Sequence, residues 1–229
     1  MKKIINYFNK TEKLLWSVSV FMIFTAFILF DGSNIAAPIC SMVGVTSIIF
    51  NAKGNPFGQL LMIAFSIFYG VISFEFRYYG EMLTYLGMVA PMAVIALVSW
   101  IKNPFKGKRA QVKIENLKIG EPWLIAVLSV LVTALFYFAL KWLGNANLIP
   151  STVSITTSFV AAYLTFRRNP YYAFWYMAND MVLIVLWILA VFADVSALSV
   201  VICFFAFLLN DTYCFLNWKN MKKLQQTSC

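Results

Sequence analysis

The chain has 229 residues, of which 62% are hydrophobic and only 12% are charged. This composition is too apolar for a soluble domain and indicates an integral membrane protein. The net charge of +9 does not indicate nucleic-acid binding, because most basic residues stand in short gaps between apolar stretches, where they set topology and contact anionic lipid.

The chain divides into eight apolar stretches, each near the length that a helix needs to cross about 30 Å of hydrocarbon. They predict an all-α integral membrane protein with eight transmembrane helices. The first stretch is expected to be a retained helix and not a cleaved signal peptide, because its apolar run is long. In chain order the predicted spans are Leu14–Phe30, Asn34–Phe50, Phe57–Phe74, Glu81–Ile101, Trp123–Leu143, Pro150–Phe166, Tyr171–Phe192 and Val195–Trp218.

The short gaps between the spans alternate in charge. The N-terminal segment and the gaps after spans two, four, six and eight carry nearly all of the Lys and Arg, whereas the opposite gaps hold Arg77, with Lys141 at the end of span five. The positive-inside rule therefore places both termini in the cytoplasm. We expect a multi-pass protein of the cell's inner membrane, with the lipid bilayer as its surroundings. A homo-oligomer is compatible with the sequence, which does not fix the oligomeric state.

Two turn sequences recur along the chain. A basic residue followed by Asn-Pro stands between spans two and three and again between spans six and seven, with Lys53 and Arg167 lying 114 positions apart. Spans four and eight end near Trp100 and Trp218, which lie 118 positions apart. Chance recurrence stays open as an alternative, since such sequences are common at membrane edges. The recurrence otherwise predicts two three-helix repeats in the same orientation, as in transporters built from parallel repeats.

The predicted architecture is thus one N-terminal helix plus a 3+1+3 parallel-repeat bundle, in which span five joins the repeats. The predicted segments are 1–33 (N-terminal cytoplasmic segment and additional helix), 34–103 (first repeat), 104–149 (basic loop and linker helix), 150–218 (second repeat) and 219–229 (basic cytoplasmic tail).

Polar side chains lie at a depth where they cost free energy unless they are paired or solvated. Spans seven and eight carry Asn179-Asp180 and Asn210-Asp211, and a central Asp costs roughly 2.5–3.5 kcal/mol on insertion scales. Both Asn residues are expected about 12 Å from the basic end of their helices, at 1.5 Å per residue. Span six adds Ser154, Thr157 and Ser158 at a similar level. Three helices therefore place hydrogen-bonding groups in one slab, and such groups indicate a functional site.

Helical spacing predicts which of these side chains share a face. Tyr172, Trp175 and Asn179 are spaced i, i+3, i+7 on span seven, and Asn210 and Tyr213 are spaced i, i+3 on span eight. Aromatic rings can stack on a flat, and preferably cationic, ring. Asn offers a donor and an acceptor to a carboxamide or to ribose hydroxyls. We therefore predict a binding site for a small flat molecule, with Gln59 and Tyr69 of span three as weaker candidates.

Alternatives remain for several of these residues. Trp100, Trp142, Trp218, Tyr171 and Tyr172 are also typical interface anchors, and the hydroxyls of span six can bond to helix carbonyls. Asp180 and Asp211 either couple transport to protons or hold one helix against another. Pro91 of span four predicts a kink near mid-bilayer.

The sequence indicates neither a metal site nor a cofactor. It has no histidine and four cysteines whose spacing suits no metal. We therefore expect no enzyme, although an aspartyl-type site on Asp180 and Asp211 is an alternative. A scaffold or lipid-binding protein is another alternative, which would not need a polar slab.

Over almost its whole length the chain resembles the PnuC family of nicotinamide riboside transporters. The resemblance lies in five short motifs taken in order: Lys53-Gly54-Asn55, Tyr79-Gly80-Glu81, Arg167-Arg168 followed by the aromatic Asn/Asp segment of span seven, Asn210-x-x-Tyr213, and Asn217-Trp218-Lys219. The family's span-seven motif is Trp-x-x-Trp; here Tyr172, which can still stack, stands first and Trp175 second.

The resemblance implies a 3+1+3 core related to the SWEET sugar transporters, preceded by one additional helix. It implies uptake of nicotinamide riboside, an NAD precursor, by facilitated diffusion with alternating access, and trapping inside the cell by a separate kinase. A related vitamin, thiamine or riboflavin, is the alternative substrate, and a sugar fits less well with so many aromatic residues.

Overall fold

The computed structural model describes residues 7–32, 35–75, 79–145 and 147–227. The predicted start of span two at Asn34, and Arg77, lie outside these residues. Within them, seven helical stretches are long and apolar enough to cross a membrane, and an eighth apolar helix is shorter. The elements are α2 (Lys10–Phe30), α3 (Ala36–Ala52), α4 (Phe57–Glu75), α5 (Tyr79–Thr84), η1 (Tyr85–Val89), α6 (Ala90–Lys102), β1 (Pro104–Phe105), β2 (Lys108–Val112), α7 (Glu121–Trp142), α8 (Leu148–Phe166), α9 (Tyr171–Val191), η2 (Val195–Ala197) and α10 (Leu198–Thr227).

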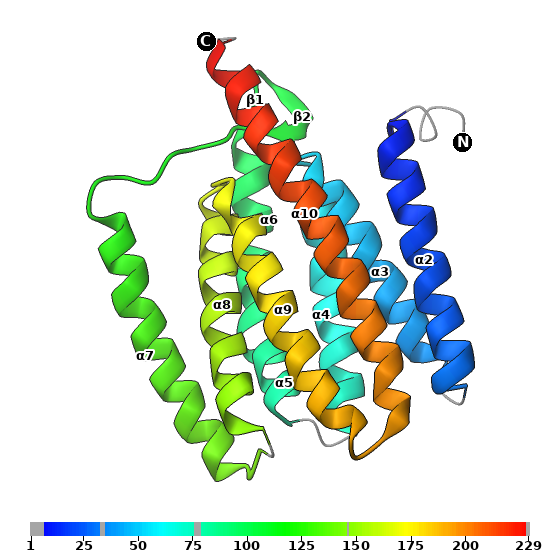
Figure 1. Ribbon diagram of the computed structural model, residues 1–229. Helices are drawn as coiled ribbons and strands as arrows, with labels where there is room; N and C mark the ends of the chain where they lie inside the picture. Colours follow the sequence, from blue (N-terminus) through cyan, green and yellow to red (C-terminus); the bar gives the residue numbers. More distant parts are fainter. Residues whose placement is uncertain (1–6, 33–34, 76–78, 146, 228–229) are drawn as a thin grey trace.

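Six helical stretches form a closed ring. In ring order α3 contacts α4, α4 contacts α6, α6 contacts α8, α8 contacts α9, α9 contacts α10, and α10 contacts α3. Outside this ring α2 packs against α3 and α10, whereas α7 packs against α8 and stands apart from the rest of the bundle (Figure 1). The ring positions the side chains of α3, α4, η1, α8, α9 and α10 around a common interior.

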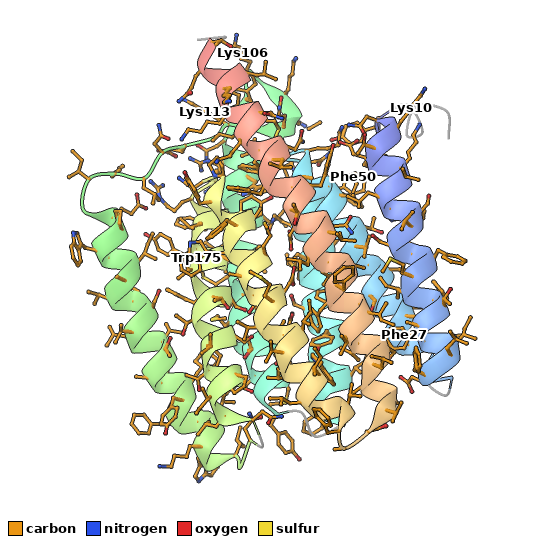
Figure 2. All side chains as sticks on the ribbon, viewed as in Figure 1. Lys10, Phe27, Phe50, Lys106, Lys113 and Trp175 are labelled. Carbon is orange, nitrogen blue, oxygen red and sulfur yellow. The ribbon has the colours of Figure 1, made fainter. Side chains whose placement is uncertain are left out.

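Basic residues gather at one end of the bundle. The start of α2, the β1–β2 hairpin and the end of α10 lie together at the top of Figure 1, which we call the terminal end. Figure 2 shows Lys10, Lys106 and Lys113 at this end and Phe27 near the opposite end. The predicted alternation of basic and non-basic gaps therefore corresponds to two distinct ends of one bundle.

Ion pairs attach the two outer helices to the terminal end of the ring. Glu12 of α2 binds Nζ of Lys53, which follows α3, at 3.1 Å. Glu121, the first residue of α7, pairs with Arg167, which follows α8. A carboxylate of each outer helix thus binds the basic residue of an Asn-Pro turn: α2 is joined to the turn after α3, and α7 is joined to the turn after α8.

The fourth predicted span is a helix with a widened turn. Helices α5, η1 and α6 run on from Tyr79 to Lys102, and in the π-helical turn η1 the backbone N–H of Ala90 donates to the carbonyl of Tyr85. Pro91 follows directly. Proline has no N–H to donate and crowds the preceding turn, which favours such a local change of helical geometry. The sequence predicted a kink at Pro91 but did not predict the π-helical turn before it.

The loop at the start of the predicted segment 104–149 and the predicted tail 219–229 both contain regular structure that the sequence did not predict. The loop contains an antiparallel hairpin of β1 and β2, and α10 continues to Thr227. The Gln225 side chain donates to the Val112 carbonyl at 3.0 Å and accepts from the Ile114 N–H at 2.9 Å. These bonds satisfy backbone groups at the end of β2 and just after it, and they join the last turns of α10 to this segment.

Candidate functional site

A cavity lies at the centre of the ring and is lined from six elements. It has room for only a few water molecules. It is enclosed by aromatic, aliphatic and polar side chains. Its lining consists of Gly44, Ile48 and Asn51 from α3, Met62 and Phe65 from α4, Tyr85 and Val89 from η1, Ser158 from α8, Tyr172, Tyr176, Asn179 and Asp180 from α9, and Phe207 and Asp211 from α10.

The polar slab predicted from spans six and seven is present on one side of this cavity. Oδ1 of Asn179 accepts from the hydroxyls of Ser154 at 3.0 Å, Thr157 at 2.9 Å and Ser158 at 3.0 Å. All four residues are buried. Because one oxygen receives three donors, the Asn179 side chain is held in a fixed orientation at the cavity wall.

Asp180 and Asp211 form a carboxyl pair across the interface of α9 and α10. Only 4% and 5% of their surfaces are exposed, and both residues line the central cavity. The lining of the central cavity contains these two acidic groups and, among its described residues, no Lys or Arg.

The face of α9 that lines the cavity differs from the predicted face by one position. Tyr172 and Asn179 line it as expected, but the second ring comes from Tyr176. Trp175 is partly buried and packs edge-on against Phe174, with ring centroids 6.3 Å apart, on the side of α9 toward α8 in Figure 2. Spacing i, i+4 was available in the sequence as a signal for Tyr176.

Asn210 and Tyr213 point from α10 toward the outer helix α2. The Asn210 amide donates to the hydroxyl of Ser19 at 2.7 Å, and the Tyr213 hydroxyl donates to Glu12 at 3.0 Å. Neither is part of the cavity lining. Their neighbour Asp211 lies about 100° further round the helix, which places its carboxyl on the cavity side.

The two candidates from span three occupy different places. Gln59 lies behind the cavity wall, where its amide donates to Oδ1 of the lining residue Asn51 at 2.9 Å. Tyr69 lines a second pocket nearer the opposite end, and its ring lies 4.5 Å from that of Tyr85. The sequence did not predict that Asn51 lines the cavity, because a single Asn at the end of a helix is typical of the turn that follows.

An aromatic layer closes the terminal end of the cavity. Trp100, Trp218 and Tyr172 are buried, with ring centroids 4.9–6.4 Å apart. The interpretation of these three residues as interface anchors is wrong. The Trp100 indole N–H donates to the Thr165 carbonyl at 2.8 Å and the Trp218 indole N–H donates to the Asn51 carbonyl at 2.7 Å. Trp142, by contrast, is 86% exposed.

The described residues contain no group of three or more His, Cys, Asp or Glu side chains placed to hold a metal ion. The site consists of two carboxyl groups, a carboxamide held by three hydroxyls, and aromatic rings that meet edge to face. The sequence matches the nicotinamide mononucleotide transporter family over residues 34–220. The chain belongs to this family. It is thus a multi-pass membrane protein of a transporter family and not an enzyme.

Characterised members of the family resemble the chain over most of their length. The "Nicotinamide riboside transporter PnuC" of Neisseria mucosa is 25% identical over 214 residues, which cover 91% of this chain and 81% of that protein. The protein of the same name from Haemophilus influenzae is 22% identical over 189 residues, covering 82% and 80%. The crystal structure of a "Vitamin B3 transporter PnuC" has the same fold, with a TM-score of 0.82, 22% identity, and coverage of 95% and 94% of the two chains.

Proposed function

We propose that this protein carries nicotinamide riboside across the cell's inner membrane by facilitated diffusion with alternating access. The observation that carries the proposal is the central cavity, which combines tyrosine rings, a fixed carboxamide and two carboxyl groups. Nicotinamide riboside has a flat pyridinium ring with a fixed positive charge, a carboxamide and ribose hydroxyls. Each of these groups has a chemical counterpart in the cavity wall.

The charge of the cavity favours a nucleoside over its nucleotide. The family is named for the mononucleotide, whereas the two relatives are named for the riboside. A phosphate group would bring about two negative charges toward Asp180 and Asp211, and no basic side chain of the described lining would receive it. A positively charged ring is attracted by the same pair.

The proposed roles follow from position. Tyr176 would stack on the pyridinium ring, with the ring of Tyr172 beside it at an interplanar angle of 84°. Asn179, fixed by Ser154, Thr157 and Ser158, would bind the carboxamide or the ribose. Five other proposed substrate residues lie outside the cavity lining in this conformation: Trp175, Asn210, Tyr213, Gln59 and Tyr69. They would act either by supporting the lining or by joining it in another conformation.

The 3+1+3 arrangement is supported by reciprocal contacts between the two proposed repeats. The Trp100 indole donates to the Thr165 carbonyl, and the Trp218 indole donates to the Asn51 carbonyl. The two donors are 118 positions apart in the chain, and the two acceptors are 114 positions apart. Next to them Ser99 donates to the Phe166 carbonyl at 2.9 Å and Asn217 to the Ala52 carbonyl at 2.7 Å, with the same offsets. We infer that α3, α4 and α5–η1–α6 form one repeat, that α8, α9 and α10 form the other, and that α7 joins them.

Alternating access is supported by the small size of the cavity, since a nucleoside needs more room than a few waters. We propose that the terminal end is cytoplasmic, because it carries the excess of basic residues. We also propose that phosphorylation by a separate kinase traps the substrate inside the cell.

Thiamine, which is also cationic, and riboflavin are the alternative substrates.

Equilibrium binding to the purified protein tests the substrate. We expect nicotinamide riboside to bind more tightly than its mononucleotide, nicotinamide, thiamine or riboflavin. Asp180→Asn and Asp211→Asn should each weaken riboside binding by about 1.5–3 kcal/mol, roughly tenfold to a hundredfold, the range for losing a charged hydrogen-bond partner. Glu115→Gln is the control for loss of one negative charge, because Glu115 lies outside both the central cavity and its neighbours and its side chain is 37% exposed; it should bind like the parent. Equal affinity for riboside and mononucleotide would refute the proposal.

A further inference from the structure

A second cavity lies between the central cavity and the end of the bundle opposite the termini. We call it the outer vestibule. It opens near Asp31 and Asp194, which stand in the turns at that end, and it is lined further in by Cys40, Tyr69, Val200 and Cys203. Two residues, Phe65 and Phe207, line both the outer vestibule and the central cavity. These two side chains therefore form the partition between them.

The side chains of Phe65 and Phe207 meet in the interior of the helix bundle. Phe65 comes from α4 and Phe207 from α10, which are separated by α3 in the ring order. Their ring centroids lie 5.7 Å apart at an interplanar angle of 74°, and only 4% and 5% of the residues' surfaces are exposed. The two rings thus meet edge to face where the linings of the two cavities adjoin.

Gly44 of α3 provides the surface on which the two rings rest. A Cβ atom at this position would lie 2.7 Å from Cζ of Phe207 and 3.0 Å from Cε2 of Phe65. Any side chain at position 44 would therefore force one or both rings to move. The close approach of both rings to the backbone explains why a glycine is required inside a transmembrane helix at this level.

The partition differs in kind from the layer at the terminal end. The ring centroids of Phe65 and Tyr85 lie 5.8 Å apart and those of Phe207 and Phe204 lie 5.7 Å apart, and both pairs meet edge to face. Phenylalanine rings carry no hydrogen-bonding groups, so separating them breaks no hydrogen bond. Opening the terminal end would instead break the indole-to-carbonyl bonds of Trp100 and Trp218. The barrier formed by the phenylalanine rings can therefore open without breaking hydrogen bonds, whereas opening the terminal end breaks two.

We propose that Phe65 and Phe207, seated on Gly44, are the outer gate of the transport path, through which substrate passes from the outer vestibule to the central cavity. The inference rests on the proposed transport function and names its outer barrier. Tyr85 belongs to the π-helical turn η1, and such turns are frequent at functional sites. A shift of η1 would withdraw the support of the Phe65 ring.

The gate is tested by cysteine labelling, without substrate. In a variant with all native cysteines replaced, Met62→Cys reports on the central cavity and Val200→Cys on the outer vestibule. Right-side-out vesicles are treated with a membrane-impermeant methanethiosulfonate. We expect Val200→Cys to react readily and Met62→Cys slowly. Adding Phe207→Ala should speed labelling of Met62→Cys by about tenfold or more, since the rate scales with the open fraction, a minor state in the parent.

Phe205→Ala is the matched control, because it truncates a half-exposed phenylalanine on the same helix. It should leave the rate at Met62→Cys unchanged, and Phe207→Ala should leave the rate at Val200→Cys unchanged. The proposal is overturned if Phe207→Ala has no effect at Met62→Cys, if it accelerates both reporters alike, or if Val200→Cys reacts only from the other side. Because no substrate is present, these outcomes are separate from a failure of the proposed substrate to bind.

Discussion

Asn179 shows how the site is fixed before a ligand arrives. Three hydroxyls from α8 converge on its Oδ1, so the carboxamide loses little conformational freedom when it binds. This part of the site was predictable, because Ser, Thr and Asn stood at matching depths in consecutive spans. The alternative for Thr157, a bond to its own helix, is also present, since its hydroxyl lies 3.1 Å from the Val153 carbonyl.

Tyr176 and Trp175 allow a direct test of which face of α9 contacts the substrate. Tyr176 lines the central cavity and Trp175 does not, so Tyr176→Ala should weaken riboside binding by about 1–3 kcal/mol, the cost of losing a stacking contact. Trp175→Ala should cost less. Both are measured by equilibrium binding to purified protein. If Trp175→Ala is the more damaging change, the binding-competent state has α9 rotated toward the face with i, i+3 spacing.

At the scale of elements, the burial of Trp100 and Trp218 was not predictable from their own positions. Tryptophan near the end of an apolar span is the usual signal for a membrane-interface anchor. What changes the outcome is the partner: the carbonyls of Thr165 and Asn51 on neighbouring helices accept the two indole N–H groups. The same holds for Asn210 and Tyr213, whose partners Ser19 and Glu12 belong to α2. Helical spacing predicts which residues share a face, but it does not predict which neighbour that face meets.

Trp218→Ala should therefore destabilise the protein. Removing a buried indole that also satisfies a carbonyl is expected to cost about 3–5 kcal/mol. Trp142→Ala is the matched control, because that side chain is 86% exposed, and it should change stability little. Thermal unfolding in detergent measures both. If the Trp218→Ala protein unfolds at the same temperature as the parent, the indole does not stabilise the bundle and the interpretation of Trp218 as an interface anchor is the better one.

At the scale of the whole molecule, the helical stretches were predictable because length and apolar content suffice to identify them. The hairpin and the continuation of α10 were not, since both depend on contacts of Gln225 with residues that are distant in sequence. The outer vestibule was not predictable either, because Phe65 and Phe207 are two of the chain's 22 phenylalanines. Only their meeting over Gly44 distinguishes them.

The charge of the central cavity leads to a prediction about the driving force of transport. A carrier that moves a cation alone responds to the membrane potential, which contributes about 2.3 kcal/mol per charge for each 100 mV. In liposomes without a kinase, nicotinamide riboside should reach equal concentrations at zero potential. An inside-negative potassium diffusion potential of about 100 mV should produce roughly fiftyfold accumulation by the same relation.

A pH gradient at zero potential distinguishes this mode from proton exchange. In proton exchange, a proton on the Asp180–Asp211 pair would leave to the outside as the cation binds from there, and a proton would return to the pair from the inside once the cation is released, so that transport is electroneutral. We expect no proton to be exchanged in this way, so that a pH gradient alone produces no accumulation above that of protein-free liposomes. Accumulation that follows the pH gradient and ignores the potential would instead assign proton coupling to the pair, and Asp180→Asn and Asp211→Asn should then abolish it.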